Sequence, residues 1–341
     1  MRIYRVWAGV MSVLAGFVLA LQPGEGNAQG LTKVTVGYSA VDYTYLPLKI
    51  AEEAKLFEKH GLEASVILVR GGSAMMKTLL AGEVAAAFIG GTAVVLARAA
   101  GGDAKIVFGL NNALVYQIVA GPHMQGKVSR IEDLKGKRVA ISSRGAESES
   151  VVRLALGKYK VDPREVIFLN IGESGERLAA LKAGTADVTP LPSPQHVRAI
   201  KGGFPVVMDV AQENLAWIHT GIAMKESWVR QQPRVAEALV KTFVEATLYG
   251  WANKEFTKKV LAKYIKDDSE DVLEQGYRDF VEYQAKNFRP SSAGIQAAIE
   301  EMAEINPKVK DVKPEAIVDL SLLDQLERSG FVAEMKKRYS R

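Results

Sequence analysis

The stretch LLAGEVA at residues 79–85 returns as LKAGTAD at residues 181–187. Each copy precedes a short apolar run that predicts a strand, at residues 86–89 and 188–191, and then come a loop and a helix that ends in Gly-Gly. The offset is 102 residues within the stretch and 101 residues at the Gly-Gly pairs. A single strand–helix unit with a glycine cap would look the same, but agreement over successive elements favours two similar α/β lobes.

The chain ahead of the first copy alternates strand-like and helix-like segments. A β-branched run at residues 34–38 predicts a strand, and apolar residues at helical spacing predict a helix over residues 46–59. A second strand is expected at residues 64–69, followed by a helix over residues 74–81 that Ser73 could cap. Strands and helices in this rhythm predict a parallel sheet with helices on both faces.

The last third of the chain, from Pro233, shows helical patterns without strands. We expect it to pack back on the first lobe, so that the chain crosses between the lobes twice, near residues 120–127 and 217–224. The first lobe would then comprise residues 29–122 and 222–341, and the second lobe residues 123–221. Two crossings make a hinge, and a hinge between two lobes makes a cleft that closes on a ligand.

The first 28 residues have the features of a secretory signal peptide. Arg2 and Arg5 precede an uncharged apolar run at residues 6–21, and small residues at positions 26–28 suit cleavage before Gln29. The run is shorter than the ~20 residues of a membrane-spanning helix, although an uncleaved anchor remains the alternative. The sequence therefore predicts a cleaved signal peptide and a monomeric mature protein in the periplasm.

The composition is that of an ordinary globular protein, with 48% hydrophobic and 24% charged residues among 341. The absence of cysteine excludes disulfides, thiolate metal sites and cysteine nucleophiles. The four histidines are scattered, so no metal site is expected. The net charge of +5 is modest and not clustered, which predicts no nucleic-acid partner.

Catalytic and cofactor-binding motifs are absent from the sequence. There is no Gly-x-Ser-x-Gly elbow and no dinucleotide fingerprint. Residues 121–128 approach a phosphate-binding loop, but Val128 stands where magnesium needs Ser or Thr, and Pro122 removes a backbone donor. We therefore expect a binding protein without a cofactor, not an enzyme.

Candidate ligand-binding residues gather in the loops that follow the predicted strands. Ligands of open α/β sheets bind beyond the carboxyl ends of the strands, where helix N-termini offer N–H groups and a positive dipole. Glycines there allow close backbone approach, and hydroxyls, aromatic rings and arginines supply contacts. The predicted ligand-binding residues are Tyr38, Ser39, Tyr43, Arg70, Gly72, Ser73, Gly91, Thr92, Asn111, Arg144, Gly145, Ser148, Thr189, Ser193, Trp217 and His219.

Two of these candidates, Arg70 and Arg144, follow predicted strands in opposite lobes. A guanidinium on one or both could clamp a carboxylate, a sulfonate or a phosphate. The alternative is that each arginine faces water, as surface arginines usually do. For His219, the alternative is a histidine satisfied by its neighbours in the hinge.

The order of motifs along the chain resembles a known family. The motifs are VGYS at residues 36–39, GGS at 71–73, LAG at 80–82, DLKGKRV at 133–139 and DLS at 319–321. In this order they resemble the nitrate/sulfonate/taurine-type substrate-binding proteins of ABC transporters, which are similar to thiamine-pyrimidine precursor proteins.

The resemblance implies a type II periplasmic binding fold, with two Rossmann-like α/β lobes and a helical C-terminal extension. It also implies a small organic ligand, anionic or aromatic (a sulfonate, a carboxylate or a heterocycle). The ligand would be delivered to an ABC permease and ATPase complex at the inner membrane. Two alternatives stay open: a solute receptor of a TRAP-type carrier, and a periplasmic enzyme on the same scaffold. The enzymes of the pyrimidine branch use a cysteine-rich iron motif, which this chain lacks.

Overall fold

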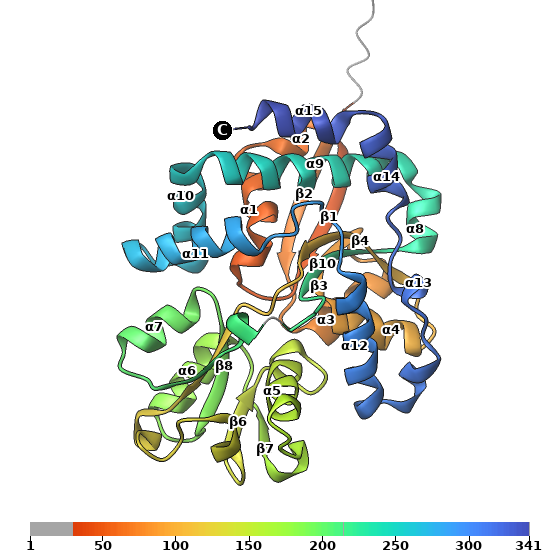
Figure 1. Ribbon diagram of the computed structural model, residues 1–341. Coiled ribbons are helices and arrows are strands. Elements are labelled where there is room, and N and C mark those ends of the chain that lie inside the picture. Colours follow the sequence, from red (N-terminus) through yellow and green to blue (C-terminus); the bar gives the residue numbers. More distant parts are fainter. Residues whose placement is uncertain (1–29, 214, 341) are drawn as a thin grey trace, which may run out of the picture. The chain divides into compact units, whose positions relative to one another are not determined.

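The computed structural model describes residues 30–213 and 215–340, so the predicted signal peptide lies outside the described residues. Two five-stranded sheets organise this part of the chain (Figure 1). The first sheet has the order β2-β1-β3-β10-β4, with β1 (Thr32–Tyr38), β2 (Leu62–Leu68), β3 (Ala86–Gly90), β4 (Ala104–Asn111) and β10 (Thr220–Lys225). The second has the order β7-β6-β8-β5-β9, with β5 (Tyr116–Ala120), β6 (Arg138–Ile141), β7 (Ile167–Asn170), β8 (Val188–Pro192) and β9 (Val206–Asp209).

The two sheets repeat one arrangement, as the repeated sequence stretch predicts. In the first sheet, β1 runs parallel to β2 and β3, and β10 runs antiparallel to β3 and β4. In the second sheet, β6 runs parallel to β7 and β8, and β5 runs antiparallel to β8 and β9. The expectation of wholly parallel sheets is therefore wrong for one strand in each. These two strands, β5 and β10, enter their sheet directly from the other sheet, without the helical crossover that a parallel neighbour needs.

The strand β5 also corrects the expected boundary between the lobes. Residues 116–122 were assigned to the first lobe, yet Ile118 in β5 lies opposite Pro190 and Met208 of the second sheet. The first change of sheet thus falls between Asn111 and Tyr116, ahead of the expected crossing. A short apolar strand pairs with strands that are distant in sequence, so its own residues do not determine which sheet it joins.

Helices flank both sheets. The α-helices are α1 (Leu46–Glu53), α2 (Leu56–Lys59), α3 (Gly72–Ala81), α4 (Gly91–Ala99), α5 (Glu147–Lys158), α6 (Ser174–Lys182), α7 (Gln195–Lys201), α8 (Glu226–Gln231), α9 (Pro233–Ala252), α10 (Lys254–Ile265), α11 (Glu270–Tyr283), α12 (Ser292–Ile305), α13 (Pro314–Ile317), α14 (Ser321–Arg328) and α15 (Phe331–Arg338). The 3-10 helices are η1 (Tyr43–Tyr45), η2 (Pro122–Met124), η3 (Ile131–Leu134), η4 (Pro163–Glu165), η5 (Val210–Glu213) and η6 (Pro307–Asp311).

Two helix boundaries differ from the expectation. The predicted helix over residues 46–59 divides into α1 and α2, because Lys55 adopts a left-handed conformation with φ 54°. Helix α3 starts two residues earlier than predicted, at Gly72, with Gly71 (φ 90°) as the N-cap residue. Ser73 therefore lies inside the first turn of α3 and does not cap it.

The C-terminal helices pack mainly on the first sheet's helices, as expected. Helix α9 packs against α1 and α2, and α12 packs against α4, while α11 also reaches α7 of the second sheet (Figure 1). The core between α9 and β3 is aromatic: the Phe243 ring meets Phe88 edge-on at a centroid distance of 4.9 Å. Within residues 30–213 and 215–340, no helix combines the length and apolar character of a membrane-spanning segment.

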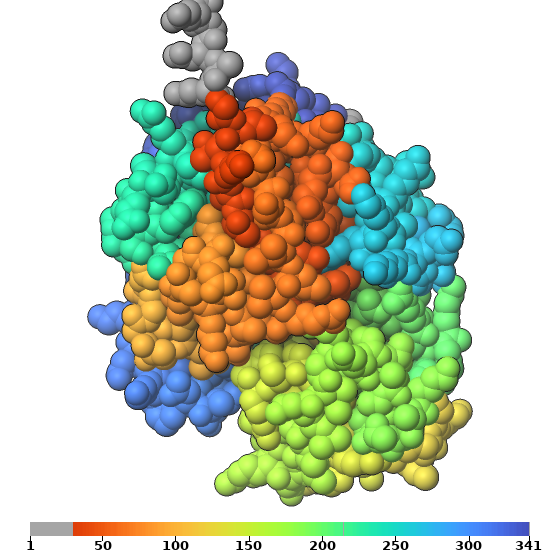
Figure 2. Space-filling model, turned by 180° about the vertical axis from the view of Figure 1, so that it is seen from behind, coloured from red at the N-terminus to blue at the C-terminus, as the bar shows by residue number. Residues whose placement is uncertain are grey.

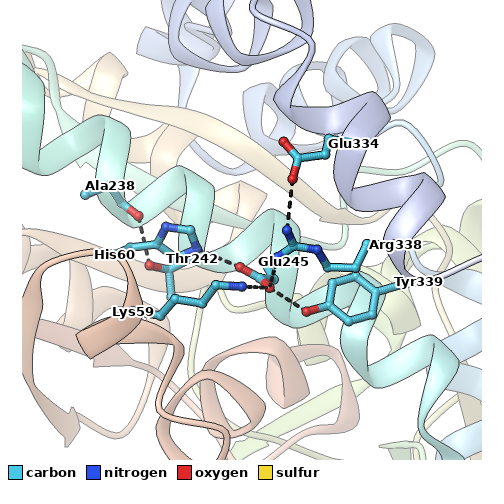
Figure 3. Close-up of polar contacts among 8 residues, drawn as sticks. All are labelled: Lys59, His60, Ala238, Thr242, Glu245, Glu334, Arg338 and Tyr339. Carbon is cyan, nitrogen blue, oxygen red and sulfur yellow. Dashed lines mark hydrogen bonds and ion pairs between the residues drawn. The ribbon is translucent and has the colours of Figure 1, made fainter.

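A buried carboxylate, Glu245 in α9, joins α9 to α2 and to the end of α15 (Figure 3). It accepts hydrogen bonds from His60 Nε2 at 2.8 Å and from the Tyr339 hydroxyl at 2.5 Å, and Lys59 pairs with it. Burial alone would raise the pKa of Glu245, but these three donors outweigh it and hold the pKa at about 2.

Candidate functional site

A cavity lies where the loops of the two sheets meet. Its lining comes from both: the loop after β1 and the first turns of α3 and α4 on one side, and the first turns of α5 and α6 on the other. The orange and yellow-green segments of the chain meet along a seam in the space-filling view (Figure 2). The lining residues are Ser39, Ala40, Val41, Asp42, Tyr45, Gly71, Gly72, Ser73, Gly90, Thr92, Ala93, Tyr116, Ser142, Gly145, Ala146, Glu147, Ser148, Glu173, Ser174, Arg177, Pro192, His219 and Thr220.

Four helices begin at the cavity, which gives it an electrostatic character. The first residues of α3, α4, α5 and α6 all belong to the lining or adjoin it. The free N–H groups at helix N-termini carry a partial positive charge and favour anions. The hydroxyls of Ser73, Ser148 and Ser174 lie in these first turns and add hydrogen-bonding groups.

Seven of the predicted residues line this cavity: Ser39, Gly72, Ser73, Thr92, Gly145, Ser148 and His219. Four others are not in the lining but are buried near it, and each forms a hydrogen bond to a lining residue or to another of the four. Tyr43 and Asn111 are bonded to each other at 2.8 Å, Thr189 accepts a hydrogen bond from Arg177 at 3.1 Å, and Trp217 donates to Glu147 at 3.1 Å. The cavity lies at the predicted loops, beyond the carboxyl ends of the strands. Many of its polar lining residues, such as Asp42, Glu147 and Arg177, are nevertheless not among the predicted ones.

The remaining five predicted residues lie elsewhere. The Tyr38 ring meets Tyr264 at a centroid distance of 6.0 Å, Gly91 packs against Ile218, and Ser193 is fully buried and is not among the lining residues. Arg70 lines a neighbouring groove with Lys77 and Glu176. Arg144 pairs with Glu149 at 2.6 Å, and its guanidinium lies over the Phe168 ring at 5.1 Å. The structure thus places neither of the two predicted clamp arginines in the cavity.

The arginine in the cavity is Arg177, in α6, and its side chain is buried with 3% of the residue exposed. Its nitrogens donate to Thr189 Oγ1 at 3.1 Å, Gly172 O at 2.7 Å, Pro190 O at 3.1 Å and Ser174 Oγ at 3.4 Å. None of these partners is a carboxylate, and Arg177 forms no ion pair in the described part of the chain. Burial lowers the pKa of Arg177, yet a guanidinium stays charged.

Sequence reasoning missed Arg177, although a signal for it exists. The loops chosen as candidates end at Ser148 and resume at Thr189, and they omit the loop after β7. That loop lies at the same edge of the second sheet, since β7 is parallel to β6, and Arg177 stands in the first turn of the helix that follows it.

A second buried charge, Asp42, lies on the first-sheet side of the cavity with 5% of the residue exposed. Its Oδ1 accepts a hydrogen bond from the Thr44 N–H at 2.8 Å and so caps η1. Burial raises the pKa of Asp42, against smaller lowering effects of His219 and of Thr44. Among the described residues, no basic side chain forms an ion pair with it.

A carboxylate–imidazole pair lines the cavity where the start of α5 meets the crossing segment before β10. Glu147, the first residue of α5, places Oε2 at 2.5 Å from His219 Nδ1 and Oε1 at 3.1 Å from Trp217 Nε1. Burial raises the pKa of Glu147. Burial would also lower the pKa of His219, but the charge and hydrogen bond of Glu147 outweigh it and raise that pKa. The ionised Glu147 carboxylate thus favours the protonated form of His219, and the two charges compensate each other when both groups are ionised.

Two tyrosines form the aromatic part of the lining. The Tyr45 hydroxyl is bonded to Ser39 Oγ at 2.9 Å, and the Tyr116 ring meets the His219 ring edge-on at a centroid distance of 5.5 Å. Burial raises the pKa of both tyrosines well above the usual value, so both remain neutral. In the described residues no group of His, Asp and Glu is arranged to hold a metal ion.

The known proteins that resemble this chain agree with the architecture. A binding-protein candidate of Brucella abortus is 27% identical over 246 residues, which cover 70% of this chain and 73% of that protein. The structure of the periplasmic nitrate-binding protein NrtA from Synechocystis superposes with a TM-score of 0.72 at 16% identity, covering 89% of this chain and 91% of NrtA. That of the periplasmic aliphatic sulphonate-binding protein SsuA from Escherichia coli gives a TM-score of 0.67 at 19% identity, covering 85% and 96%.

These similarities confirm the expected α/β periplasmic binding fold. Each of its two sheets combines parallel and antiparallel strands. They also confirm the expected resemblance to sulfonate- and nitrate-type binding proteins. The family model described as the NMT1-like family matches residues 27–266. Since this match spans well over half of the sequence, the chain belongs to the NMT1-like family.

Proposed function

We propose that the protein is the substrate-binding protein of an ABC import system. It would act in the periplasm as a monomer, bind a small organic acid in the cavity between the lobes and deliver it to a membrane permease and ATPase. Membership of the NMT1-like family, the relatives described as binding proteins and the fold shared with NrtA and SsuA support this proposal.

The observation that carries the proposal is the state of Arg177. A guanidinium that is taken out of water loses several kcal/mol of solvation unless an opposite charge compensates it. The hydrogen-bond acceptors of Arg177 are all neutral, and the charges of Glu173 and Glu176 act on it without forming an ion pair. Arg177 also lines a cavity into which several helix N-termini point. An anionic group bound there would supply the missing charge, because carboxylates and sulfonates match the planar guanidinium.

The two sheets suggest how the ligand would close the protein. We take residues 31–111 and 220–340 as one lobe and residues 116–209 as the other, joined by the two crossing segments. A ligand stabilises a closed form only as far as it contacts both lobes. The cavity meets this condition, since Asp42 and Ser73 come from one lobe and Arg177 and Ser148 from the other.

A thermal-shift screen of the mature chain from Gln29 tests the proposal. The panel contains alkyl and aryl sulfonates, aliphatic and aromatic carboxylates, inorganic oxyanions and pyrimidines. A compound at about 100 times its Kd adds about 2.7 kcal/mol to the free energy of unfolding. We expect a clear shift from one class of organic acid, with the compound recovered unchanged. No shift from any class, or conversion of the compound, would contradict the proposal, and conversion would favour an enzyme.

The transport partner is tested separately. An ABC importer predicts that the protein, loaded with the compound from the screen, stimulates ATP hydrolysis by a permease–ATPase complex encoded beside it. A neighbouring gene for a large carrier subunit without an ATPase would instead favour a TRAP-type carrier.

A further inference from the structure

A hydrogen bond between Ser150 and Glu301 joins the two lobes beside the cavity. Ser150 lies in α5 of the second lobe and is fully buried, and Glu301 lies in α12 of the first lobe. The Ser150 hydroxyl donates to Glu301 Oε2 at 3.2 Å, where α12 lies next to α5 (Figure 1). The first turn of α5 also supplies Glu147 and Ser148 to the cavity lining, so this bond acts on an element that shapes the cavity.

The Glu301 carboxyl is poorly suited to carry a charge in this contact. Its Oε1 is buried and accepts no hydrogen bond from the described residues. Burial raises the pKa of Glu301 to about 7, against smaller lowering effects of the Ser150 hydroxyl and the Arg153 charge. The charges of Glu149 and Glu304 raise this pKa as well. The contact therefore favours the neutral acid.

The charges around Glu301 do not reverse this preference. Arg153 is already paired with Glu149 at 2.8 Å. The pKa of Glu149 is lowered by hydrogen bonds from Gly145 and two arginines, although burial opposes them, so Glu149 stays ionised. Helix α12 also packs against α4, η6, α13 and the crossing segment at Trp217. The ionisable residues there are Arg98, Lys308, Lys310, Asp311, Glu315 and His219, and in the described part of the chain none of them bonds to Glu301.

We propose that Glu301 is a proton-dependent link between the lobes: the neutral carboxyl holds α5 to α12, and the ionised carboxyl releases α5. When the contact opens, the acid regains water, and its pKa returns toward the ordinary value of 4.5. Closing therefore takes up a proton between about pH 4.5 and 7, and the closed form is favoured as the pH falls through this range. Above pH 7 the effect levels off. This inference goes beyond the proposed receptor function, because it concerns the lobes without a ligand.

Spin labels on two introduced cysteines test the inference by reporting the distance between the lobes. The chain has no cysteine of its own, so Glu83→Cys and Lys182→Cys take one label each. Both positions are exposed and lie at the far ends of α3 and α6, whose first turns line the cavity. Pulsed electron paramagnetic resonance of the mature chain without ligand gives the closed-to-open ratio at about pH 5.5 and about pH 7.5. We expect this ratio to be at least about fivefold higher at the lower pH.

Glu301→Gln supplies the decisive variant, because the amide stays neutral at both pH values and keeps an oxygen that can accept from Ser150. We expect the variant to retain less than about a third of the pH effect and to be more closed than the parent at the higher pH. Asp279 in α11, whose pKa burial raises to about 6, and the pair of Glu147 and His219 also titrate. They are the same in both proteins, so the difference between the proteins belongs to Glu301.

The matched control is Glu300→Gln, which changes an exposed acid of the same helix that is bonded to Gln296 at 2.8 Å. It should keep the full pH effect. A closed-to-open ratio that does not rise at the lower pH overturns the inference, as does an equal pH effect in Glu301→Gln and its parent. An equal loss in Glu300→Gln and Glu301→Gln overturns it too. None of these outcomes bears on the receptor function, which the thermal-shift screen tests with ligands.

Discussion

At the scale of single residues, the site depends on which charged side chains are buried and how they are paired. Arg144 and Arg177 both follow strands of the second sheet, but of these two only Arg144 forms an ion pair with a carboxylate of the described residues, although the charges of Glu173 and Glu176 also act on Arg177. Arg177 is surrounded by hydroxyls and carbonyls, and these orient its guanidinium without neutralising it. The two arginines differ in how they are packed. Residue type and position alone therefore pointed to Arg144, which lies outside the cavity lining, and not to Arg177.

Substitution of Arg177 tests this assignment. Arg177→Gln should weaken the binding of the organic acid selected by the screen by about 2–3 kcal/mol or more, because a buried charge pair would be lost. Arg177→Lys, which keeps a charge but not the bidentate geometry, should lose less. Calorimetric titration measures both.

The control for this prediction is Arg144→Ala, which removes an arginine that lies outside the cavity lining. It should bind the acid within about threefold of the unaltered protein, since the Arg144 side chain is mostly exposed and Glu149 keeps Arg153 as a second partner. Equal losses in Arg144→Ala and Arg177→Gln would contradict the assignment of Arg177.

At the scale of elements, two carboxylates hold segments that are distant in sequence. Glu147 joins the start of α5 to the crossing segment before β10 through His219 and Trp217. Glu245 joins α9 to α2 and to the residue after α15. In each case one acid accepts hydrogen bonds from residues distant in sequence, and its removal leaves donors of more than one element without that acceptor.

Glu147→Gln should loosen the crossing segment, because the amide cannot carry the charge that stabilises protonated His219. We expect faster amide hydrogen exchange at His219 and Thr220, with unchanged exchange in α9. Glu165→Gln, at the end of η4, changes an acid outside this region and should leave the exchange of both residues as it is. Unchanged exchange in Glu147→Gln would show that the pair does not secure the crossing segment.

Glu245→Gln should reduce the free energy of unfolding by about 1–3 kcal/mol at neutral pH, because a buried acid with several donors is lost. The folded pKa of about 2 lies below the ordinary value of 4.5, so this stabilisation is present above pH 4.5 and disappears as the pH falls toward 2. Urea unfolding at neutral and acidic pH measures the difference between the unaltered protein and the variant.

The matched control for Glu245→Gln is Glu165→Gln, which removes an exposed acid from its pair with Lys135, outside the cluster around Glu245. It should change the free energy of unfolding by less than about 0.5 kcal/mol at either pH. A loss in Glu245→Gln that stays constant down to pH 2 would contradict the role of its charge.

At the scale of the whole molecule, the repeated stretch at residues 79–85 and 181–187 predicted two lobes of the same architecture, and both copies precede corresponding strands, β3 and β8. Local patterns were sufficient for this because each lobe is built from successive strand–helix units. The membership of β5 could not be predicted in the same way, since its pairing with β8 and β9 is non-local.

The position of the cavity could be predicted in part, while ligand binding by the predicted residues stays a prediction. The loops at the carboxyl ends of the strands do surround the cavity, and residues such as Ser39, Thr92 and Ser148 line it. The buried charged residues of this cavity, Asp42 and Arg177, could not be predicted, because what sets them apart is burial without an ion pair among the described residues. That property depends on the packing of both lobes and has no counterpart in a local sequence motif.

The most direct test of this account is a crystal structure of the mature chain with the organic acid that gives the largest thermal shift. We predict that the acid group lies within hydrogen-bonding distance of the Arg177 guanidinium and that the molecule also contacts the first-lobe loops around Asp42 and Ser73. A ligand held by one lobe alone, or bound away from Arg177, would contradict the account.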